Sequence, residues 1–259
     1  MIEELMPVVF IGHGSPMNAI ENNEFTRAWK DIAKKIPKPK CILCISAHWL
    51  KGNTAVLSTE NPKLVYDFYG FPQKLYDVNY PVKGSLAYAK TIKESIRTVK
   101  VALDDSWGID HGAWSVLIHM YPYADIPIIQ LSINPDMPLE NHVKIGKELT
   151  ALRSQGVLIL GSGNIVHNLR MMRVDGEPFS WAEEFDDYIV KNLKDGNVSN
   201  LVNYEKNKDS QHAVPTNDHY IPLLYIIGSA DMKKERPIFY CQNIFYSSLS
   251  MTCVCYGMR

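Results

Sequence analysis

The fold of this chain is decided by residues 8–35, which read VVFIGHGSPMNAIENNEFTRAWKDIAKK. The consecutive apolar residues 8–11 predict a short buried strand, and apolar residues recur at helical spacing over residues 24–35. The turn between them, Gly12-His13-Gly14-Ser15-Pro16, places a histidine between two glycines. A strand followed by a helix is one βα unit, so this stretch predicts a sheet covered by helices.

The same alternation of strand and helix continues along the chain. Loops are predicted over residues 59–82, which are rich in Pro, Gly, Tyr and Asp, and over the polar surface stretch 196–211. Further strands are predicted at residues 41–46, 54–58, 99–103, 126–132 and 157–160, and further helices at residues 85–98, 113–121, 138–154, 180–193 and 219–227. Residues 238–241 and 249–256 are predicted to be strands added antiparallel to the sheet. We therefore expect a single α/β domain over residues 1–259, with a central, mostly parallel (mixed) sheet and helices on both faces.

Two helix starts have recognisable signals. Ser180 followed three residues later by Glu183 is the pattern of a capping box. Pro222 fits a helix only in its first turn, where its missing N–H has no partner in any case. His219 is therefore expected at a helix N-terminus, whose dipole disfavours the charged imidazolium and keeps the ring neutral.

Composition and charge limit the partners of this protein. The 259 residues are 46% hydrophobic and carry a net charge of −1, with charges of both signs interspersed. Such a chain can bury a large core, and it has no basic surface for nucleic acid or for an anionic membrane. A small-molecule substrate, no nucleic-acid or membrane partner, and a monomer or small homo-oligomer are expected.

Localisation is predicted to be cytoplasmic. The first seven residues contain two acids and no basic stretch, which does not resemble a secretory signal. No apolar run approaches the length of a membrane span. The odd number of cysteines, five, favours reduced thiols.

The cysteines are predicted to be buried structural thiols. Cys41 and Cys44 are three residues apart in a predicted strand, so they point to opposite faces and do not form a redox or zinc motif. Cys253 and Cys255 share one face of the last strand, but no second Cys/His pair with zinc-finger spacing accompanies them.

Four histidines follow predicted strands or begin a predicted helix: His13, His48, His167 and His219. Ligands of α/β sheets bind beyond the carboxyl ends of the strands, where loops bring several side chains together. The strands before His13 and His48, if adjacent and parallel, would bring these two side chains together. Because imidazole is the commonest ligand for transition metals, the pattern predicts one metal site.

A competing interpretation concerns the glycine-rich stretch Gly161-Ser162-Gly163-Asn164, which follows a predicted strand. Such a turn can expose backbone N–H groups to a phosphate. It lacks the Lys-Ser/Thr of a P-loop and the complete dinucleotide fingerprint, so the phosphate interpretation is the weaker one.

Five motifs, in order along nearly the whole chain, resemble those of the class III extradiol ring-cleavage dioxygenases, the LigB-like superfamily, and within it the 4,5-DOPA dioxygenase branch. They are Gly12-His13-Gly14-Ser15-Pro16-Met17, Ser46-Ala47-His48-Trp49, Asp110-His111-Gly112-Ala113-Trp114, Gly161-Ser162-Gly163-Asn164-Ile165-Val166-His167-Asn168, and Pro215-Thr216-Asn217-Asp218-His219-Tyr220-Ile221-Pro222-Leu223.

The resemblance implies a non-haem Fe(II) enzyme that uses O₂ to open a catechol ring next to the diol. The substrate would be L-DOPA or a similar small catechol, and the product a muconate-semialdehyde-type compound such as seco-DOPA. By motif position, His13, His48 and His219 would be the metal ligands. A three-histidine set also suits Zn(II).

The resemblance also implies roles for two further histidines. His167 matches the acid/base residue of the family, although a fourth metal ligand is the alternative for it. His111 matches a histidine that lines the pocket, and it would hydrogen-bond to substrate or oxygen. The remaining histidines, His119, His142 and His212, are expected to be structural or on the surface.

Two alternatives compete with the dioxygenase hypothesis. A zinc hydrolase would use the same histidines with an acid/base carboxylate, for which Asp110, Asp218 or Glu140 are candidates. The second alternative is a non-enzymatic member of the fold. Expected pocket walls are Trp49, Phe68 and Tyr76, and Arg170 and Arg173 are expected to have ordinary surface roles.

Overall fold

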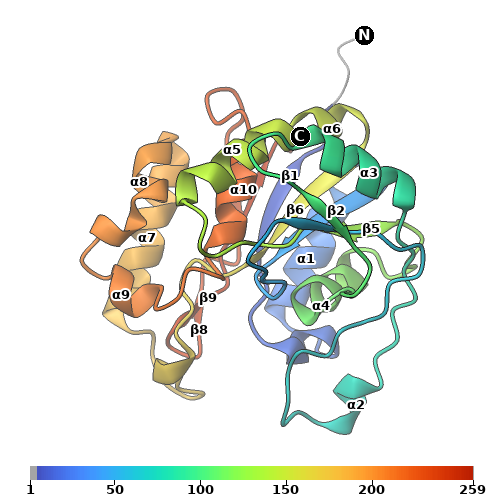
Figure 1. The fold of residues 1–259 in the computed structure, drawn as a ribbon. Helices are drawn as coiled ribbons and strands as arrows, with labels where there is room; N and C mark the ends of the chain where they lie inside the picture. The colour runs from blue at the N-terminus through green and yellow to red at the C-terminus, as the bar shows by residue number, and fades with distance from the viewer. Residues whose placement is uncertain (1–4, 259) are drawn as a thin grey trace.

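The computed structural model describes residues 5–258, which form an α/β fold around a six-stranded sheet (Figure 1). The strands of this sheet are β1 (Val8–Gly12), β2 (Cys41–Ser46), β5 (Ile128–Gln130), β6 (Val157–Gly163), β7 (Ile238–Tyr240) and β10 (Cys253–Tyr256). They lie in the order β5-β2-β6-β1-β10-β7. The first four of these are parallel to one another, whereas β10 pairs antiparallel with β1 and with β7. The predicted mostly parallel, mixed sheet is confirmed.

The strand order corrects one expectation, because β1 and β2 are not neighbours. β6 lies between them and pairs in parallel with both, with Gly161 opposite Phe10 on one side and opposite Ile45 on the other. The carboxyl ends of β1, β6 and β2 therefore lie side by side at one edge of the sheet. β6 ends in Gly161-Ser162-Gly163, and its two glycines leave room for the close approach of Pro222 and His219.

Helices cover both faces of the sheet, as predicted (Figure 1). Alternate residues of β1 belong to different cores: Phe10 packs in one and Ile11 in the other. The main helices are α1 (Glu24–Lys34) and α4 (His111–Met120) on the Ile11 face, and α5 (Leu139–Leu149) and α10 (Ile221–Ser229) on the Phe10 face. α10 is buried on all sides, which explains its almost entirely apolar sequence.

The remaining elements complete the described chain. The additional helices are α2 (Gln73–Tyr76), α3 (Leu86–Ser95), α6 (Ala151–Ser154), α7 (Ser180–Asp195), α8 (Val198–Val202) and α9 (Ser210–Ala213), with 3₁₀ turns η1 (Pro16–Ala19), η2 (Leu169–Met171) and η3 (Tyr204–Lys206). Two small sheets pair β3 (Ala55–Leu57) with β4 (Ala102–Asp104), in parallel, and β8 (Ile244–Phe245) with β9 (Leu249–Ser250), antiparallel.

The polar stretch 196–211 differs from its prediction as a loop. It contains α8, η3 and the start of α9, and it buries Leu201, Val202 and Tyr204 against the core of α7 and α10. Its many Asn, Lys and Asp residues lie on the solvent side. The few apolar residues therefore give only a weak periodic signal for a helix. Short helices of this kind are stabilised by packing rather than by propensity.

The predicted capping box at Ser180 is wrong. The N-cap of α7 is Phe179, which makes no side-chain capping bond, and Ser180 is the first helical residue. The predicted terminal strand 249–256 is also divided: residues 249–250 pair with β8, and only residues 253–256 join the main sheet. Tyr246 and Ser247, both at positive φ, form the turn that separates β8 from β9.

Four cysteines lie as predicted, whereas Cys241 is only partly buried. Cys41 and Cys44 belong to opposite cores, Cys253 and Cys255 share one core, and all four are buried. All five cysteines of the chain are free thiols. Within residues 5–258, none of the helices combines the length and the apolar character that a membrane span requires.

A buried carboxyl group ties α7 to the end of β9. Asp186 accepts hydrogen bonds from the hydroxyls of Ser250, at 2.5 Å, and Thr252, at 2.9 Å. Burial raises the pKa of Asp186 from 3.8 to about 6, although the two hydroxyls oppose the shift. A carboxyl whose pKa is higher in the folded than in the unfolded protein stabilises the fold while it is protonated, and this contribution is lost as the pH rises through that range.

We therefore expect Asp186 to make the protein less stable as the pH rises from 4 to 7. Relative to the Asp186→Asn variant, which cannot titrate there, the wild-type free energy of unfolding should fall by about 2 kcal/mol between these pH values. Urea unfolding of both proteins across this range measures the difference. Stability curves that stay parallel would show that Asp186 does not titrate in this range.

Candidate metal centre

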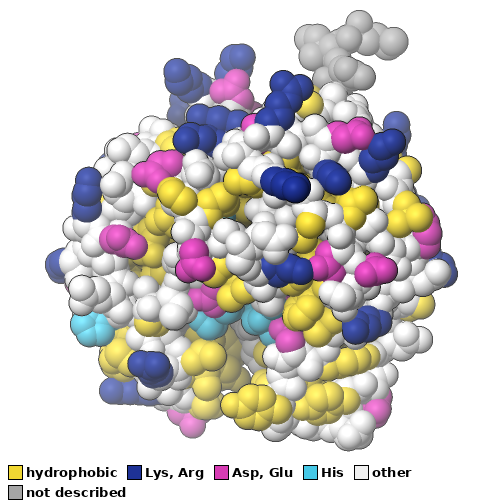
Figure 2. All heavy atoms as spheres, in the orientation of Figure 1, with side chains coloured by type: hydrophobic (Ala, Val, Ile, Leu, Met, Phe, Trp, Pro, Cys, Tyr) yellow, Lys and Arg dark blue, Asp and Glu magenta, His cyan; other side chains and the backbone are white. Residues whose placement is uncertain are grey.

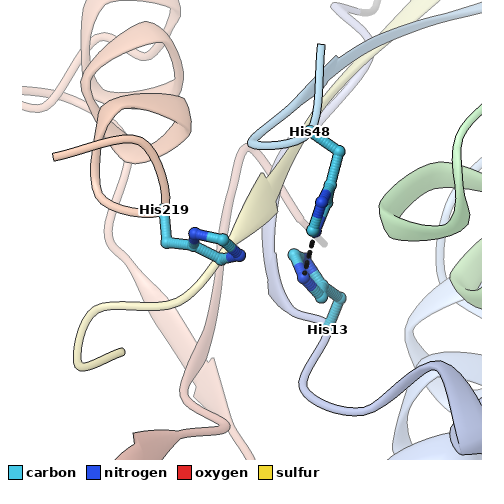
Figure 3. Close-up of side chains that lie close together, drawn as sticks. All are labelled: His13, His48 and His219. Atoms are coloured by element: carbon cyan, nitrogen blue, oxygen red, sulfur yellow. Dashed lines mark hydrogen bonds between the residues drawn. The ribbon is translucent and has the colours of Figure 1, made fainter. Parts of the chain in front are cut away.

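Three histidines from distant parts of the chain converge at the carboxyl edge of the sheet. His13 directly follows β1, His48 follows β2 by two residues, and His219 precedes α10 by two residues. One ring nitrogen from each lies within 4.8 Å of the others. Figure 3 shows the three rings pointing toward a common point.

The contact between His13 and His48 requires a proton or a cation between their two ring nitrogens. Their Nε2 atoms are 3.1 Å apart. Two imidazole nitrogens that both present lone pairs repel each other at this distance, so a proton or a cation must lie between them. This arrangement is typical of side chains that share a metal ion.

The ring orientation of His13 is fixed from β6. Ser162 donates its hydroxyl proton to the backbone carbonyl of Gly112, at 2.5 Å. Its oxygen therefore accepts a hydrogen bond from Nδ1 of His13, at 3.0 Å. With the proton on Nδ1, Nε2 of His13 presents its lone pair to the centre.

His219 is held in the same way. Its Nδ1 donates to the Asp218 carboxylate at 2.7 Å, while its buried Nε2 has no hydrogen-bond partner among the described residues. A Cβ at Gly163 would lie 2.1 Å from the carbonyl oxygen of His219, so only glycine permits this close approach of β6. An orphaned, buried nitrogen beside two other imidazoles fits a metal ion.

Burial and nearby carboxylates together set the charge states of the three central rings. Burial lowers the pKa of His13 well below its usual value, and the neighbouring His48 adds to the effect. The pKa of His219 is lowered by burial as well, although Asp218 opposes the shift. For His48, burial alone would lower the pKa, but Asp67 and Asp110 outweigh it and raise the pKa. Neutral His13 and His219 can act as nitrogen ligands.

Asp67 is a member of the site that the sequence did not reveal. Its carboxylate lies 3.0 Å from Nδ1 of His48 and 2.9 Å from Nδ1 of His111. Burial would raise its pKa, but the hydrogen bonds from His111 and His48 lower it well below the usual range. The available signal is the aromatic-rich context Tyr66-Asp67-Phe68, of which only Phe68 is expected at the pocket from the sequence.

The structure places His111 as the first residue of α4, whose N-cap is Asp110. Its ring centroid is 4.0 Å from that of His48 and 5.7 Å from that of His13. Burial lowers the pKa of His111, with Asp67 opposing the shift. His111 is thus part of the pocket wall beside the three converging rings.

His167 stacks on His219, with ring centroids 3.5 Å apart and an interplanar angle of 5°. Its backbone N–H donates to the carbonyl of Ala213, and the residue forms a bridge with Leu249. His167 is not part of the group formed by the three converging histidines, whose ring nitrogens all lie within 4.8 Å of one another. Burial and the neighbouring His219 lower its pKa, so this ring is neutral as well.

A cavity of about 450 Å³ opens above these histidines. In Figure 2, histidine side chains lie along a cleft surrounded by hydrophobic side chains. Phe68 lines the cavity as predicted, whereas Trp49 is buried against Trp107 and Tyr76 packs behind Phe68. The apolar wall residues are Pro16, Met17, Phe68, Phe71, Leu169, Met172, Val174, Tyr246 and Leu249.

The remaining histidines lie outside this cavity, as expected. His119 contacts the carbonyl of Asn18 at 2.7 Å, and buried His142 contacts the Tyr225 hydroxyl at 3.0 Å. His212 is exposed. Arg170 and Arg173 are also exposed, and the Arg173 guanidinium lies over the Phe179 ring.

The carboxylates that a zinc hydrolase would need are engaged elsewhere or distant. Asp110 accepts hydrogen bonds from Ser46, at 2.6 Å, and from Gln130, at 2.7 Å. Asp218 is paired with His219, and Glu140 is exposed on α5. None of these three lines the cavity.

The phosphate-binding interpretation of residues 161–164 is also disfavoured. Gly161 and Gly163 belong to β6, and both pack closely against the start of α10. Asn164 donates from its side chain to the carbonyl of Ser250. The glycines therefore serve close packing of strand and helix rather than a phosphate-binding turn.

Comparison with known proteins agrees with the geometry. Residues 7–252 match the family model described as the catalytic LigB subunit of aromatic ring-opening dioxygenase. The chain is 44% identical to a 4,5-DOPA dioxygenase extradiol from Escherichia coli K12, covering 97% of this chain and 95% of the relative. It is 36% identical to a protein of the same name from Beta vulgaris, with 92% of each chain covered.

A solved structure is similar over the same extent. The crystal structure of an uncharacterised protein from Escherichia coli K12 superposes with a TM-score of 0.85 and 41% identity, covering 96% of this chain and 99% of that one. The family resemblance inferred from the ordered motifs is confirmed. The chain belongs to the family of the catalytic LigB subunit of aromatic ring-opening dioxygenases.

Proposed function

We propose that this protein is an Fe(II)-dependent extradiol dioxygenase that opens the ring of L-DOPA, or of a similar small catechol, with O₂. The observation that carries the proposal is the convergence of the ring nitrogens of His13, His48 and His219 beneath an open cavity. Membership of an aromatic ring-opening dioxygenase family supports the reaction class. The names of relatives that share 36–44% identity support the substrate.

In this proposal, His13, His48 and His219 hold the metal through Nε2. Three imidazole nitrogen donors suit Fe(II), and the same set accommodates Zn(II). When bound, Fe(II) would bring the catechol and O₂ together and carry electrons between them. The orphaned Nε2 of His219 and the 3.1 Å contact of His13 with His48 support these ligands.

His167 is proposed as the acid/base residue. A neutral imidazole at the cavity wall can accept a proton from a catechol hydroxyl and return it later in the reaction. Its position outside the cluster of three supports this role over that of a fourth ligand. His111, which also lines the cavity, is proposed to hydrogen-bond to the substrate or to oxygen.

The cavity walls support an aromatic substrate. Phe68 and Phe71 lie on one side, and Leu169 and Tyr246 belong to other segments of the lining. Apolar and aromatic side chains bind the faces of a catechol ring and exclude water from it, while the histidines face its hydroxyl groups. The product would be a muconate-semialdehyde-type compound. We also propose a cytoplasmic location, which the five free thiols support.

Reconstitution of the purified protein with Fe(II) under anaerobic conditions, followed by L-DOPA and air, tests the function. We expect one O₂ consumed per catechol and a yellow ring-opened product, identified by its mass increase of two oxygen atoms. Wild-type protein treated with a chelator is the control, and it should be inactive. Iron-loaded protein that consumes no O₂ with a panel of catechols would contradict the proposal.

A further inference from the structure

Asp67 occupies a position that the proposed metal centre does not by itself explain. Its side chain is 17% exposed, and it contacts His48 through Oδ2 and His111 through Oδ1. The loop that carries it is fixed: the backbone N–H of Val65 donates to the carbonyl of Ile109, and the indole N–H of Trp114 donates to the carbonyl of Val65. The carboxylate is therefore held between two rings of the site.

A third hydrogen-bond donor fixes which oxygen of the Asp67 carboxylate accepts from which imidazole. The backbone N–H of His111 also donates to Oδ1 of Asp67, at 3.1 Å. A carboxylate only accepts hydrogen bonds, so all three partners must donate to it. Both imidazoles consequently carry a proton on Nδ1, and Nε2 of neutral His48 is left with a lone pair.

We propose that Asp67 is the positioning residue that keeps His48 in the tautomer able to bind the metal. The inference rests on the proposed metal centre and goes beyond it by assigning the residue that makes His48 a ligand. His13 and His219 have their own acceptors in Ser162 and Asp218. Asp67 differs from these because it also holds His111, so one carboxylate orients a ligand and a wall residue together.

The Asp67→Asn variant gives a sharp test, because the amide has one acceptor and one donor group. The backbone N–H of His111 cannot change its role, so the amide oxygen must stay on that side. The amide NH₂ then faces Nδ1 of His48, which must accept. The proton of His48 moves to Nε2, and that nitrogen can no longer bind a metal.

We expect Asp67→Asn to weaken Zn²⁺ binding by about 10- to 100-fold, measured on metal-free protein by competition with a chromophoric chelator. Asp67→Ala should weaken it less, since water can accept from Nδ1 where the amide cannot. If Asp67 acted through its charge or packing alone, Asp67→Ala would lose at least as much Zn²⁺ affinity as Asp67→Asn. Asp77→Asn, in the same segment and exposed, removes an equal charge and should bind Zn²⁺ as the wild type does.

A second measurement follows the tautomer directly. In ¹⁵N-histidine spectra at saturating Zn²⁺, the wild type should show His48 bound through Nε2, with its proton on Nδ1. The Asp67→Asn variant should show His48 detached and protonated on Nε2, while His13 and His219 remain bound.

Either of two outcomes would overturn the proposal. In the first, Asp67→Asn binds Zn²⁺ within about threefold of the wild type, a loss too small for a missing orienting partner. In the second, Asp67→Ala loses as much Zn²⁺ affinity as Asp67→Asn. These measurements need no turnover. A protein that binds Zn²⁺ as expected but cleaves no catechol would contradict the proposed function and leave this inference intact.

Discussion

Replacing His13 by alanine is expected to lower catechol-dependent O₂ consumption by about 1,000-fold or more, because the transition state would lose several kcal/mol of stabilisation with the metal. His13 is 1% exposed, and its Nε2 lies 3.1 Å from that of His48. Its loss leaves only two converging rings. O₂ uptake after Fe(II) reconstitution, together with iron content after dialysis, measures the effect.

The matched control is His212→Ala, which removes an exposed imidazole outside the cavity. This variant should keep wild-type iron content and activity. Because His13 is buried, the circular dichroism spectrum and melting temperature of His13→Ala must be compared with those of the wild type. A folded His13→Ala variant that retains one iron per chain and a tenth of the activity would refute its role as a ligand.

Replacing His167 by alanine is expected to lower kcat by about 10²- to 10⁴-fold while metal binding is retained. His167 stacks on His219 and lines the cavity, but it lies outside the cluster of three ligand candidates. Measuring both kcat and iron content therefore distinguishes an acid/base role of His167 from a role as metal ligand. Steady-state kinetics with L-DOPA give kcat and KM, and metal analysis gives the iron content.

His167→Gln sharpens this distinction. Glutamine preserves a polar side chain of similar reach but cannot exchange a proton near neutral pH. Both variants should therefore lose kcat to a similar extent and keep their iron. A loss of iron in parallel with activity would instead identify His167 as a fourth ligand. Wild-type kcat in either variant would exclude both roles.

The sequence predicted the parts of the fold that follow from local periodicity. Apolar runs such as residues 8–11 and 41–46 are buried strands in the structure, and the amphipathic residues 24–34 form α1. The segments it misassigned have weak patterns. Residues 196–211 bury only a few apolar side chains, and the divided end of the chain depends on a turn at Tyr246 and Ser247.

The sequence by itself determined which histidines were candidates, because a histidine that follows a buried strand or precedes a helix has a predictable place at the carboxyl edge of an α/β sheet. It also carried the ordered motifs that place the chain in its family.

Only the tertiary structure decided how these side chains meet. In the folded protein, β6 lies between β1 and β2, and Asp67 of an irregular loop contacts His48 and His111. The physical reason is that strand order and loop placement follow from packing between segments far apart in sequence. Local residue patterns record which side chains are present, whereas the hydrogen bonds that orient them form only in the folded protein.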